Sequence, residues 1–414
     1  MDDKTLYARL LGLTPPWGIE RVELKLAEGE VHLFVALPMN ELWVCPECLE
    51  RAPIHDHRER TWRHLDTFQY RTLLHARVPR LNCPNHGIKQ IRVPWAEENS
   101  RFTALFEALA IEWMKQASIS AVAERLHLTW DEAAGIQARA VRRGLARRQA
   151  EPVPYLGIDE TSFQRRHRYV TVVSDLMRSR VLYVADERKR ESLDGFWEAM
   201  TDEQLRAVEG VALDMWEPYI GAVTESIPRG GEKIVFDKFH VAKHLNDAVD
   251  KVRRSEHRAL RTNGKEWLKG TKHDWLRNPA RFSLAEWRRF LRLARRSDLK
   301  TARAWSLKEE FMRFWDYRYR GAADRHFRSW YNWAIRSRLE PIKRVGRMIN
   351  RYYENIATYF RHPITNAAAE GINATIQRIK GMARGFRNPE RFRMAIYFHC
   401  GGLDLCPSTT MFTQ

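Results

Sequence analysis

YLGIDE, residues 155–160, is an apolar run that ends in two acids, and the segments that follow it decide the fold. Four further β-rich segments come after it: 169–174, 181–185, 210–214 and 233–237. The first three strands have the short spacing of an antiparallel meander, and residues 191–207 are expected to form a helix. The order of three strands, a helix, a strand, a helix and a strand predicts a mixed α/β sheet.

Carboxylates stand where three of these strands end. Asp159 and Glu160 close the first strand, Asp214 the fourth and Asp237 the fifth. Hard divalent ions such as Mg²⁺ take carboxylate oxygens. Two such ions about 4 Å apart can activate an attacking oxygen and neutralise a leaving one in phosphoryl transfer. The strand ends therefore predict a metal-dependent phosphoryl-transfer site, with ordinary polar strand ends as the alternative.

A third acid is expected far downstream, on a helix over residues 364–380. Glu370 shares one face of this helix with Asn366, Asn373 and Gln377, a pattern that suits a metal ligand beside a DNA strand. The basic side chains that follow suit contacts to phosphates, and four are predicted to bind DNA: Arg378, Lys380, Arg384 and Arg387.

A metal knuckle is predicted near the start of the chain. Cys45 and Cys48 form a CxxC pair, and Cys83 and His86 form a CxxH pair 34 residues later. Two such pairs supply the four soft ligands of a closed, tetrahedral structural zinc site. Three histidines between the pairs leave the fourth ligand open: His55, His57 and His64. A redox pair or incidental buried thiols are the alternatives. Residues 66–81 alternate apolar and polar side chains, as strands that carry the second knuckle would.

Residues 101–145 are expected to be helical and to contain a helix-turn-helix. A short helix over 118–126 is followed by a break and by Thr129-Trp130-Asp131-Glu132, a capping box that opens a longer helix. That helix ends in basic residues, of which three are predicted to contact DNA: Arg139, Arg142 and Arg143. Any three-helix bundle shares this pattern, so DNA binding here is a hypothesis.

The chain carries a net charge of +18, and this excess is local. Residues 251–350 hold 28 Lys and Arg against 10 Asp and Glu, which indicates a polyanionic partner such as nucleic acid. A solvated, Arg-rich helical surface is the alternative. Seven of the 15 Trp lie in the same stretch, and most are expected to pack between helices. Capping boxes at Ser283–Glu286 and Ser306–Glu309 are each expected to open a helix there.

Length and composition suggest two to four units in a soluble, globular chain. No run of about 18 apolar residues is present, so no transmembrane helix is expected. The acidic start of the chain is unlike a signal peptide, and an odd number of cysteines argues against a disulfide framework. The expected location is therefore the cytosol.

The sequence resembles the transposases of the ISL-three family of insertion sequences over essentially its whole length. The resemblance rests on CPEC…CPNHG, YLGIDET, VALDMWEPY, IVFDKFHVAKHLNDAVDKVR and TNAAAEGINATIQRIKGMARGFRNPERFR. It implies a zinc-binding domain, a helix-turn-helix and an RNase-H-like core interrupted by a helical insertion. It also implies a DDE recombinase that uses Mg²⁺ or Mn²⁺.

Carried over residue by residue, the resemblance makes Asp159 the first catalytic acid and Glu370 the last. The middle acid is Asp214 or Asp237. The RNase-H-like strand order places the fourth strand beside the first, about 4.8 Å away, and the fifth one spacing further. This favours Asp214, with Asp237 and Glu160 as accessory acids.

The expected domains follow from these assignments: zinc-binding at 1–98, helix-turn-helix at 99–150, catalytic core at 151–241 and 361–400, basic helical insertion at 242–360, and a tail at 401–414. The expected activity is binding of terminal inverted repeats, hydrolysis at the element ends and joining of the 3′-hydroxyls to target DNA. Both ends must be held together, so a homodimer or larger assembly is expected. A DNA-binding regulator without catalysis and an RNase-H-like nuclease that cuts without joining are the alternatives.

Overall fold

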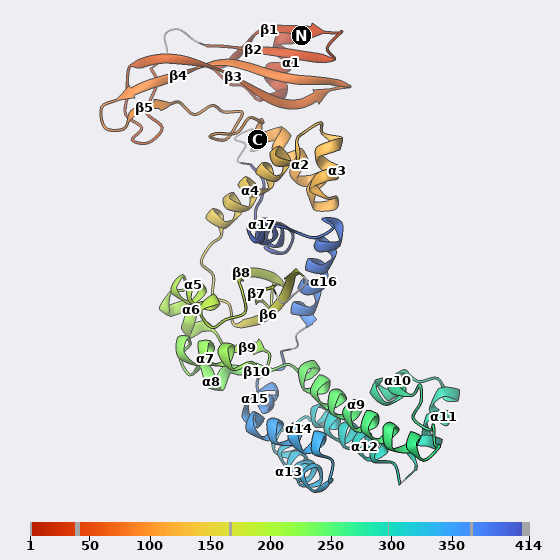
Figure 1. The fold of residues 1–414 in the computed structure, drawn as a ribbon. Helices are drawn as coiled ribbons and strands as arrows, with labels where there is room; N and C mark the ends of the chain where they lie inside the picture. The colour runs from red at the N-terminus through yellow and green to blue at the C-terminus, as the bar shows by residue number, and fades with distance from the viewer. Residues whose placement is uncertain (1, 38–41, 165–167, 297, 365–366, 408–414) are drawn as a thin grey trace. The chain divides into compact units, whose positions relative to one another are not determined.

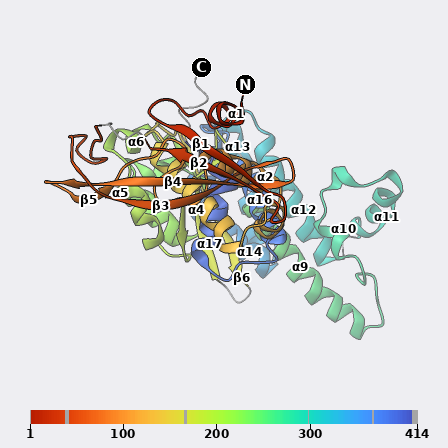
Figure 2. The same ribbon diagram turned by 90° about the horizontal axis from the view of Figure 1, so that it is seen from above.

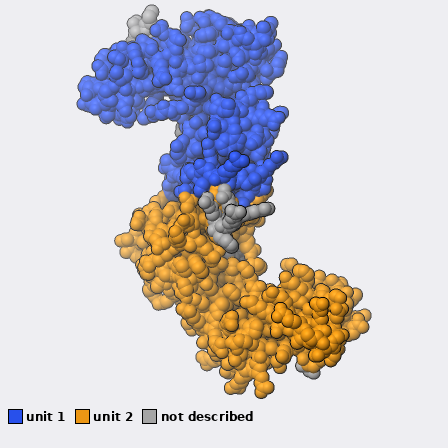
Figure 3. Space-filling model, in the orientation of Figure 1, with its two compact units in different colours: residues 1–149, 379–414 blue, residues 150–378 orange. Residues whose placement is uncertain are grey.

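The computed structural model of the chain describes residues 2–37, 42–164, 168–296, 298–364 and 367–407. The chain divides into two compact units, coloured separately in Figure 3. Unit 1 contains residues 1–149 and 379–414, and unit 2 contains residues 150–378. No helix in the described part of the chain is both long and apolar enough to cross a bilayer.

Unit 1 begins with a short helix, α1 (Asp3–Leu10), which is followed by a five-stranded sheet. Its strands are β1 (Gly18–Lys25), β2 (Glu30–Ala36), β3 (Ile54–Thr67), β4 (Tyr70–Cys83) and β5 (Gly87–Gln90). The order is β1-β2-β4-β3, and β5 pairs with the C-terminal end of β4. The long β3–β4 hairpin is visible in Figures 1 and 2. The strands expected over 66–81 fall on the end of β3 and on β4, whereas β1, β2 and most of β3 were not predicted.

The core of this sheet is built by apolar side chains from its inner face. Leu33 and Leu74 are fully buried, and the indole of Trp62 packs edge-to-face against that of Trp95 at 5.4 Å. Most of β3 is polar and half of it is exposed, so it lacks the alternating pattern that marks a half-buried strand. β3 forms a strand because it pairs with β4, although its own sequence does not predict one.

We expect one buried histidine to make unit 1 sensitive to acid. His64 in β3 is 6% exposed, and its Nδ1 lies 2.9 Å from Thr103 Oγ1. Burial, helped by the charge of Arg63, lowers the pKa of His64 from 6.5 to about 4. The unfolded chain therefore binds the extra proton between these values. We expect the contribution of this group to the free energy of unfolding to be intact above pH 6.5. It should fall by up to about 3 kcal/mol as the pH drops toward 4.

Urea unfolding at pH 7.5 and pH 5, followed by amide hydrogen exchange in β3 and β4, measures this dependence. The matched variant His64→Gln keeps a polar side chain but cannot bind the proton, so its stability should vary less over the same range. An identical pH dependence in both proteins would show that His64 is not responsible.

Three helices follow the sheet, and they form the predicted helix-turn-helix. They are α2 (Ala104–Gln116), α3 (Ile119–Arg125) and α4 (Trp130–Arg147). The capping box at Thr129 and Glu132 is confirmed, because each side chain bonds the other residue's backbone amide. His127 adopts a positive φ of 54° in the tight turn between α3 and α4.

A helix from the far end of the chain completes this bundle. α17 (Pro389–Cys400) packs against α4. A Cβ on Gly144 would lie 2.7 Å from Leu403 Cβ, so only glycine permits this approach. Residues 379–400, which were expected to belong to the catalytic core, lie in unit 1. The expected domain boundaries remain predictions.

Unit 2 contains the predicted mixed sheet. Its strands are β6 (Tyr155–Gln164), β7 (Arg168–Asp175), β8 (Arg180–Asp186), β9 (Gly210–Leu213) and β10 (Ile234–Phe236). The order is β10-β9-β6-β7-β8, with β6, β7 and β8 antiparallel and β9 and β10 parallel to β6. This is the RNase-H-like order, and it confirms the fold class predicted from the sequence.

The single helix predicted between β8 and β9 is divided into shorter helices. The helix expected over 191–207 is broken into η1 (Glu191–Leu193), α5 (Asp194–Glu198) and α6 (Asp202–Ala207). The break occurs because Thr201 and Gln204 form a capping box that starts a new helix. α7 (Glu217–Ser226) and α8 (Gly230–Lys233) lie between β9 and β10.

A large helical insertion separates β10 from α16 (Ala367–Met382), as predicted (Figure 1). Its helices are α9 (Lys238–Thr262), α10 (Lys272–Leu276), η2 (Pro279–Arg281), α11 (Leu284–Ala294), α12 (Lys300–Met312), η3 (Arg313–Asp316), α13 (Arg320–Arg336), α14 (Glu340–Arg351), α15 (Tyr353–Ala357) and η4 (Thr358–Phe360). Six of its seven Trp are buried or packed against the core, and Trp333 is exposed. The packing role expected for most of them is therefore confirmed.

The two capping boxes predicted in the insertion have different outcomes. Ser283 and Glu286 form a box that opens α11, as expected. Ser306 instead lies inside α12, where its Oγ donates to the carbonyl of Ala302, so this second prediction is wrong. The Ser-x-x-Glu pattern has no capping role inside a helix, because the backbone amides there already have partners.

Candidate functional site

The CxxC and CxxH pairs meet at one end of the sheet of unit 1. Cys45 and Cys48 lie in a tight turn, Cys83 ends β4, and His86 lies in the turn before β5. Their ligand atoms all lie within 4.8 Å of one another, with the sulfurs of Cys48 and Cys83 3.7 Å apart. Tetrahedral zinc with Zn–S bonds of about 2.3 Å holds two sulfurs about 3.8 Å apart, so this spacing fits the metal.

The electrostatics of this cluster also fit a cation. The backbone amides of Cys48 and Glu47 lower the pKa of Cys45 to about 7, which favours the thiolate that binds zinc. His86 is the histidine of the cluster, with its Nδ1 3.6 Å from Cys83 Sγ. Of the alternatives, His64 is buried against Thr103 instead. The spacing and the chemistry of these four ligands fit a structural zinc site.

Two of the predicted acids lie on neighbouring strands of unit 2. β6 and β9 are parallel, and Gly157 pairs with Ala212. Asp159 and Asp214 each follow two residues later, at the same level of adjacent strands. β10 pairs with the other side of β9, so Asp237 lies one strand further from Asp159. This is the arrangement that the sequence predicted for the three strand ends.

Each of these two acids is held by a specific partner. Asn373 Nδ2 on α16 donates to Asp159 Oδ2 at 2.6 Å, and the amide of Glu160 donates to Asp159 Oδ1 at 2.7 Å. His240 Nε2, near the start of α9, lies 2.6 Å from Asp214 Oδ1. His240 was not predicted as a partner of Asp214, because the contact joins the end of β9 to a helix that follows the next strand.

The charges of the acids act on each other and on His240. Burial, assisted by the charge of Asp214, raises the pKa of Asp159 above its ordinary value. Burial opposes protonation of His240, but the bond to Asp214 and the charges of Asp237 and Asp159 together raise its pKa. An excess of negative charge at this edge of the sheet therefore favours a bound cation.

α16 presents the predicted face of polar side chains to the sheet. Gln377 lies one helical turn after Asn373, and its Nε2 donates to Thr161 Oγ1 at 3.1 Å, two residues along β6 from Asp159. Glu370 lies on the same helix one turn earlier and is exposed. Asn366, predicted on this face, lies outside the described residues.

The carboxylate of Glu370 does not close a metal site with the two strand-end acids in this structure. Among the described residues, no group of three ligands within 4.8 Å includes Asp159, Asp214 or Glu370. All three acids had been expected to converge on shared metal ions. Asp159 and Asp214 have Asn373 and His240 as partners.

The two accessory acids have separate partners. Asp237 Oδ1 accepts from the amide of Phe239, so this side chain caps α9. Glu160 forms an ion pair with Arg188, whose guanidinium lies over the ring of Trp216 at 4.2 Å. Neither Arg188 nor Trp216 was singled out from the sequence, since each is ordinary in its local segment.

Two of the arginines predicted to contact DNA have internal roles. Arg139 Nε donates to Glu107, which is 1% exposed, at 2.9 Å. Arg143 is also nearly buried and pairs with Glu97 and Glu107. These ion pairs hold both guanidinium groups inside the bundle, where they stabilise it, and a DNA contact of Arg139 or Arg143 remains a prediction. Arg142 is exposed, and its DNA contact remains a prediction.

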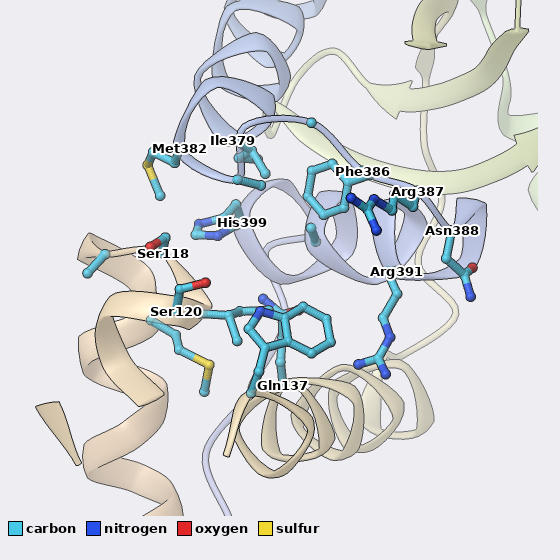
Figure 4. A pocket seen from close by; sticks show the side chains of 17 residues that line it. Ser118, Ser120, Gln137, Ile379, Met382, Phe386, Arg387, Asn388, Arg391 and His399 are labelled. Carbon is cyan, nitrogen blue, oxygen red and sulfur yellow. The ribbon is translucent and has the colours of Figure 1, made fainter. Parts of the chain in front are cut away.

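The predicted basic residues after Glu370 lie on α16 and in the turn before α17. Arg378, Arg384 and Arg387 are exposed, and Lys380 is half-buried. Arg387 and Arg391 line a cavity of about 370 Å³ between α2–α4 and the segment 379–399 (Figure 4). Arg391 also lies over the ring of Trp130 at the start of α4. Basic and aromatic side chains therefore gather at the exposed end of the helix-turn-helix.

Comparisons with known proteins agree with this architecture. Residues 156–396 match the ISL3 family of DDE transposases, described as "Transposase". Residues 41–86 match the "zinc-finger of transposase IS204/IS1001/IS1096/IS1165", and residues 91–141 match the "Helix-turn-helix domain of transposase family ISL3".

Curated relatives are similar over nearly the whole chain. A transposase for insertion sequence element IS1001 from Bordetella parapertussis is 27% identical over 93% of this chain and 96% of its own length. A transposase for insertion sequence element IS1557 from Mycobacterium tuberculosis is also 27% identical, over 94% of each chain. The transposase match alone covers more than half of the sequence, and the chain therefore belongs to the ISL3 family of insertion-sequence transposases.

Proposed function

We propose that this chain binds the terminal inverted repeats of its insertion sequence, hydrolyses a phosphodiester at each element end and joins the freed 3′-hydroxyls to target DNA. The observation that carries the proposal is the pair Asp159 and Asp214 at the same level of adjacent parallel strands. The printed names of the relatives, each a transposase for an insertion sequence element, support the same activity.

Asp159 and Asp214 are the residues that would hold Mg²⁺ or Mn²⁺, with Glu370 as the third acid. The donor set fits, because hard divalent ions take carboxylate oxygens and the site has excess negative charge. Such ions, when bound, make an oxygen nucleophile stronger and neutralise the charge on the leaving oxygen. We propose that Glu370 joins the pair once the negative charge of the acids is neutralised, with Asp237 and Glu160 as accessory acids.

The neighbours of the two acids prepare the site for this role. Asn373 and the amide of Glu160 each donate to one oxygen of Asp159, which fixes the orientation of that carboxylate. His240 does the same for Asp214. Partners that orient a ligand raise metal affinity, and their loss costs roughly 10- to 100-fold in affinity or activity. No covalent link between enzyme and DNA is needed.

Unit 1 and the basic residues of the chain would bind the DNA. The helix-turn-helix and Arg142 would contact the terminal repeats, and Arg378, Lys380, Arg384 and Arg387 would contact phosphates, with Asn373 and Gln377 beside the bound strand. Structural Zn²⁺ would be held by Cys45, Cys48, Cys83 and His86. Since the two element ends must be held together while each is joined to target DNA, a dimer or larger assembly would act on DNA in the cytoplasm, at the nucleoid.

A strand-transfer assay tests the proposal. Purified protein is incubated with labelled terminal-repeat DNA, a target plasmid and Mg²⁺, and the products are separated on a denaturing gel. We expect cleavage at the element end and joined products, both dependent on the divalent ion. Binding without cleavage would identify a DNA-binding regulator instead, and cleavage without joining would identify a nuclease.

A further inference from the structure

Trp216 is an exposed indole beside the acids of unit 2. It follows Asp214 by two residues, at the N-cap of α7, and is 36% exposed. Every other described tryptophan of unit 2 except Trp333 is buried or packed against the core. Exposing so large an apolar ring costs free energy, and an exposed aromatic next to catalytic groups is typical of a binding surface.

The ring of Trp216 is held in place from the strand that carries the first acid. The guanidinium of Arg188 lies over the ring at 4.2 Å, and Arg188 forms an ion pair with Glu160. Glu160 is the neighbour of Asp159 in β6. The chain of contacts from Glu160 through Arg188 to Trp216 therefore connects the ends of β6 and β9, on which Asp159 and Asp214 lie.

This arrangement matches the chemistry of an unpaired nucleobase better than that of a phosphate. An indole offers a flat apolar face on which any base can stack. The charge of Arg188 is already balanced by Glu160, which leaves less of it for a phosphate. Duplex DNA hides the faces of its bases, so only an unpaired base could stack on Trp216.

We propose that Trp216, held by Arg188, binds an unpaired base of the DNA next to the scissile phosphate at the element end. This proposal rests on the proposed function, since it takes the DNA end to be the substrate of the acids beside Trp216. Stacking would stabilise the opened base pair and fix the strand close to Asp159 and Asp214.

A binding experiment tests this site without depending on catalysis. Terminal-repeat duplexes carry one unpaired nucleotide just outside the element end, either with its base or as an abasic residue, and affinities are measured by fluorescence anisotropy in Ca²⁺. We expect Trp216→Ala to weaken binding of the base-containing DNA by roughly 5- to 150-fold. It should leave affinity for the abasic DNA unchanged, because the stacking partner is already missing.

Three controls keep the result specific. Trp216→Phe retains an aromatic face and should keep most of the affinity. Trp333→Ala removes the other exposed indole of unit 2 and should change neither affinity. The thermal midpoints of the variants show whether they fold. An equal loss by Trp216→Ala on both DNAs, or no loss on either, would overturn the proposal. Failure of the wild-type protein to cleave or join DNA would instead contradict the proposed function and leave this comparison valid.

Discussion

Replacing Asp159 or Asp214 by Asn should reduce both cleavage and joining by roughly 1,000-fold or more while leaving binding to terminal-repeat DNA intact. Each change preserves the shape of the side chain but removes the negative charge that would hold a divalent ion. A loss of this size corresponds to about 4 kcal/mol of transition-state stabilisation. The measurement is the initial rate of strand cleavage at saturating Mg²⁺, with DNA affinity determined in parallel.

Asp237→Asn is the matched control for this prediction. Asp237 also follows a strand of the same sheet, but it lies one strand further from Asp159 and caps α9. Asn caps helices as well as Asp does, so the helix should be preserved and activity should stay within a few-fold of wild type. If Asp237→Asn abolished activity and Asp214→Asn retained it, the assignment of the middle acid would be wrong.

Metal preference gives a second readout for Asp214. A thiolate binds Mn²⁺ better than Mg²⁺, because Mg²⁺ strongly prefers oxygen ligands. Asp214→Cys should therefore be inactive with Mg²⁺ and regain part of its activity with Mn²⁺. A structural defect would not respond to the identity of the ion.

Loss of zinc should have the second large effect, on DNA binding by unit 1. We expect one zinc per chain in the wild-type protein, and Cys48→Ser or Cys83→Ser should release it. Structural zinc contributes roughly 10–16 kcal/mol to the folding of small zinc-finger peptides. Here the apolar core of β1–β4 should survive, so unfolding should be confined to the turns that carry the four ligands. Metal content measures the loss of zinc, and hydrogen exchange over residues 43–51 and 83–90 measures the local unfolding. The affinity for terminal-repeat DNA measures the effect on DNA binding.

The control for zinc release is Cys406→Ser, which removes an exposed cysteine outside the cluster. It should retain zinc and full DNA affinity. A zinc-selective chelator in excess Mg²⁺ should reproduce the Cys48→Ser result in the wild-type protein. Stoichiometric zinc in Cys48→Ser would contradict a site built from these four ligands.

The sheet of unit 2 could be predicted because its strands are short, apolar and closely spaced. Each strand is marked by its own residues, and the acids stand directly at strand ends. The adjacency of Asp159 and Asp214 followed from the RNase-H-like strand order that the family resemblance implied. The CxxC and CxxH pairs were equally local signals. The face of α16 could be predicted because helical spacing places Asn373 and Gln377 on one side.

The features that were missed depend on contacts between distant parts of the chain. β3 is a polar strand that is ordered by its pairing with β4, and its sequence shows no apolar alternation. Arg139 and Arg143 look like DNA contacts on a helix end until Glu97 and Glu107 are brought beside them. The contacts of His240 with Asp214 and of Arg188 with Trp216 likewise join separate elements, and no local pattern signals them.

The packing of α17 and the following segment against α4 has a consequence for the order of synthesis. α4 is complete by residue 147, but the helix and the leucine that cover it, α17 and Leu403, are made about 250 residues later. At ribosomal rates this delay is on the order of 10 to 50 s. A nascent chain would therefore expose the uncovered side of α4 until translation passes Leu403, and a product truncated before α17 would keep that side exposed permanently.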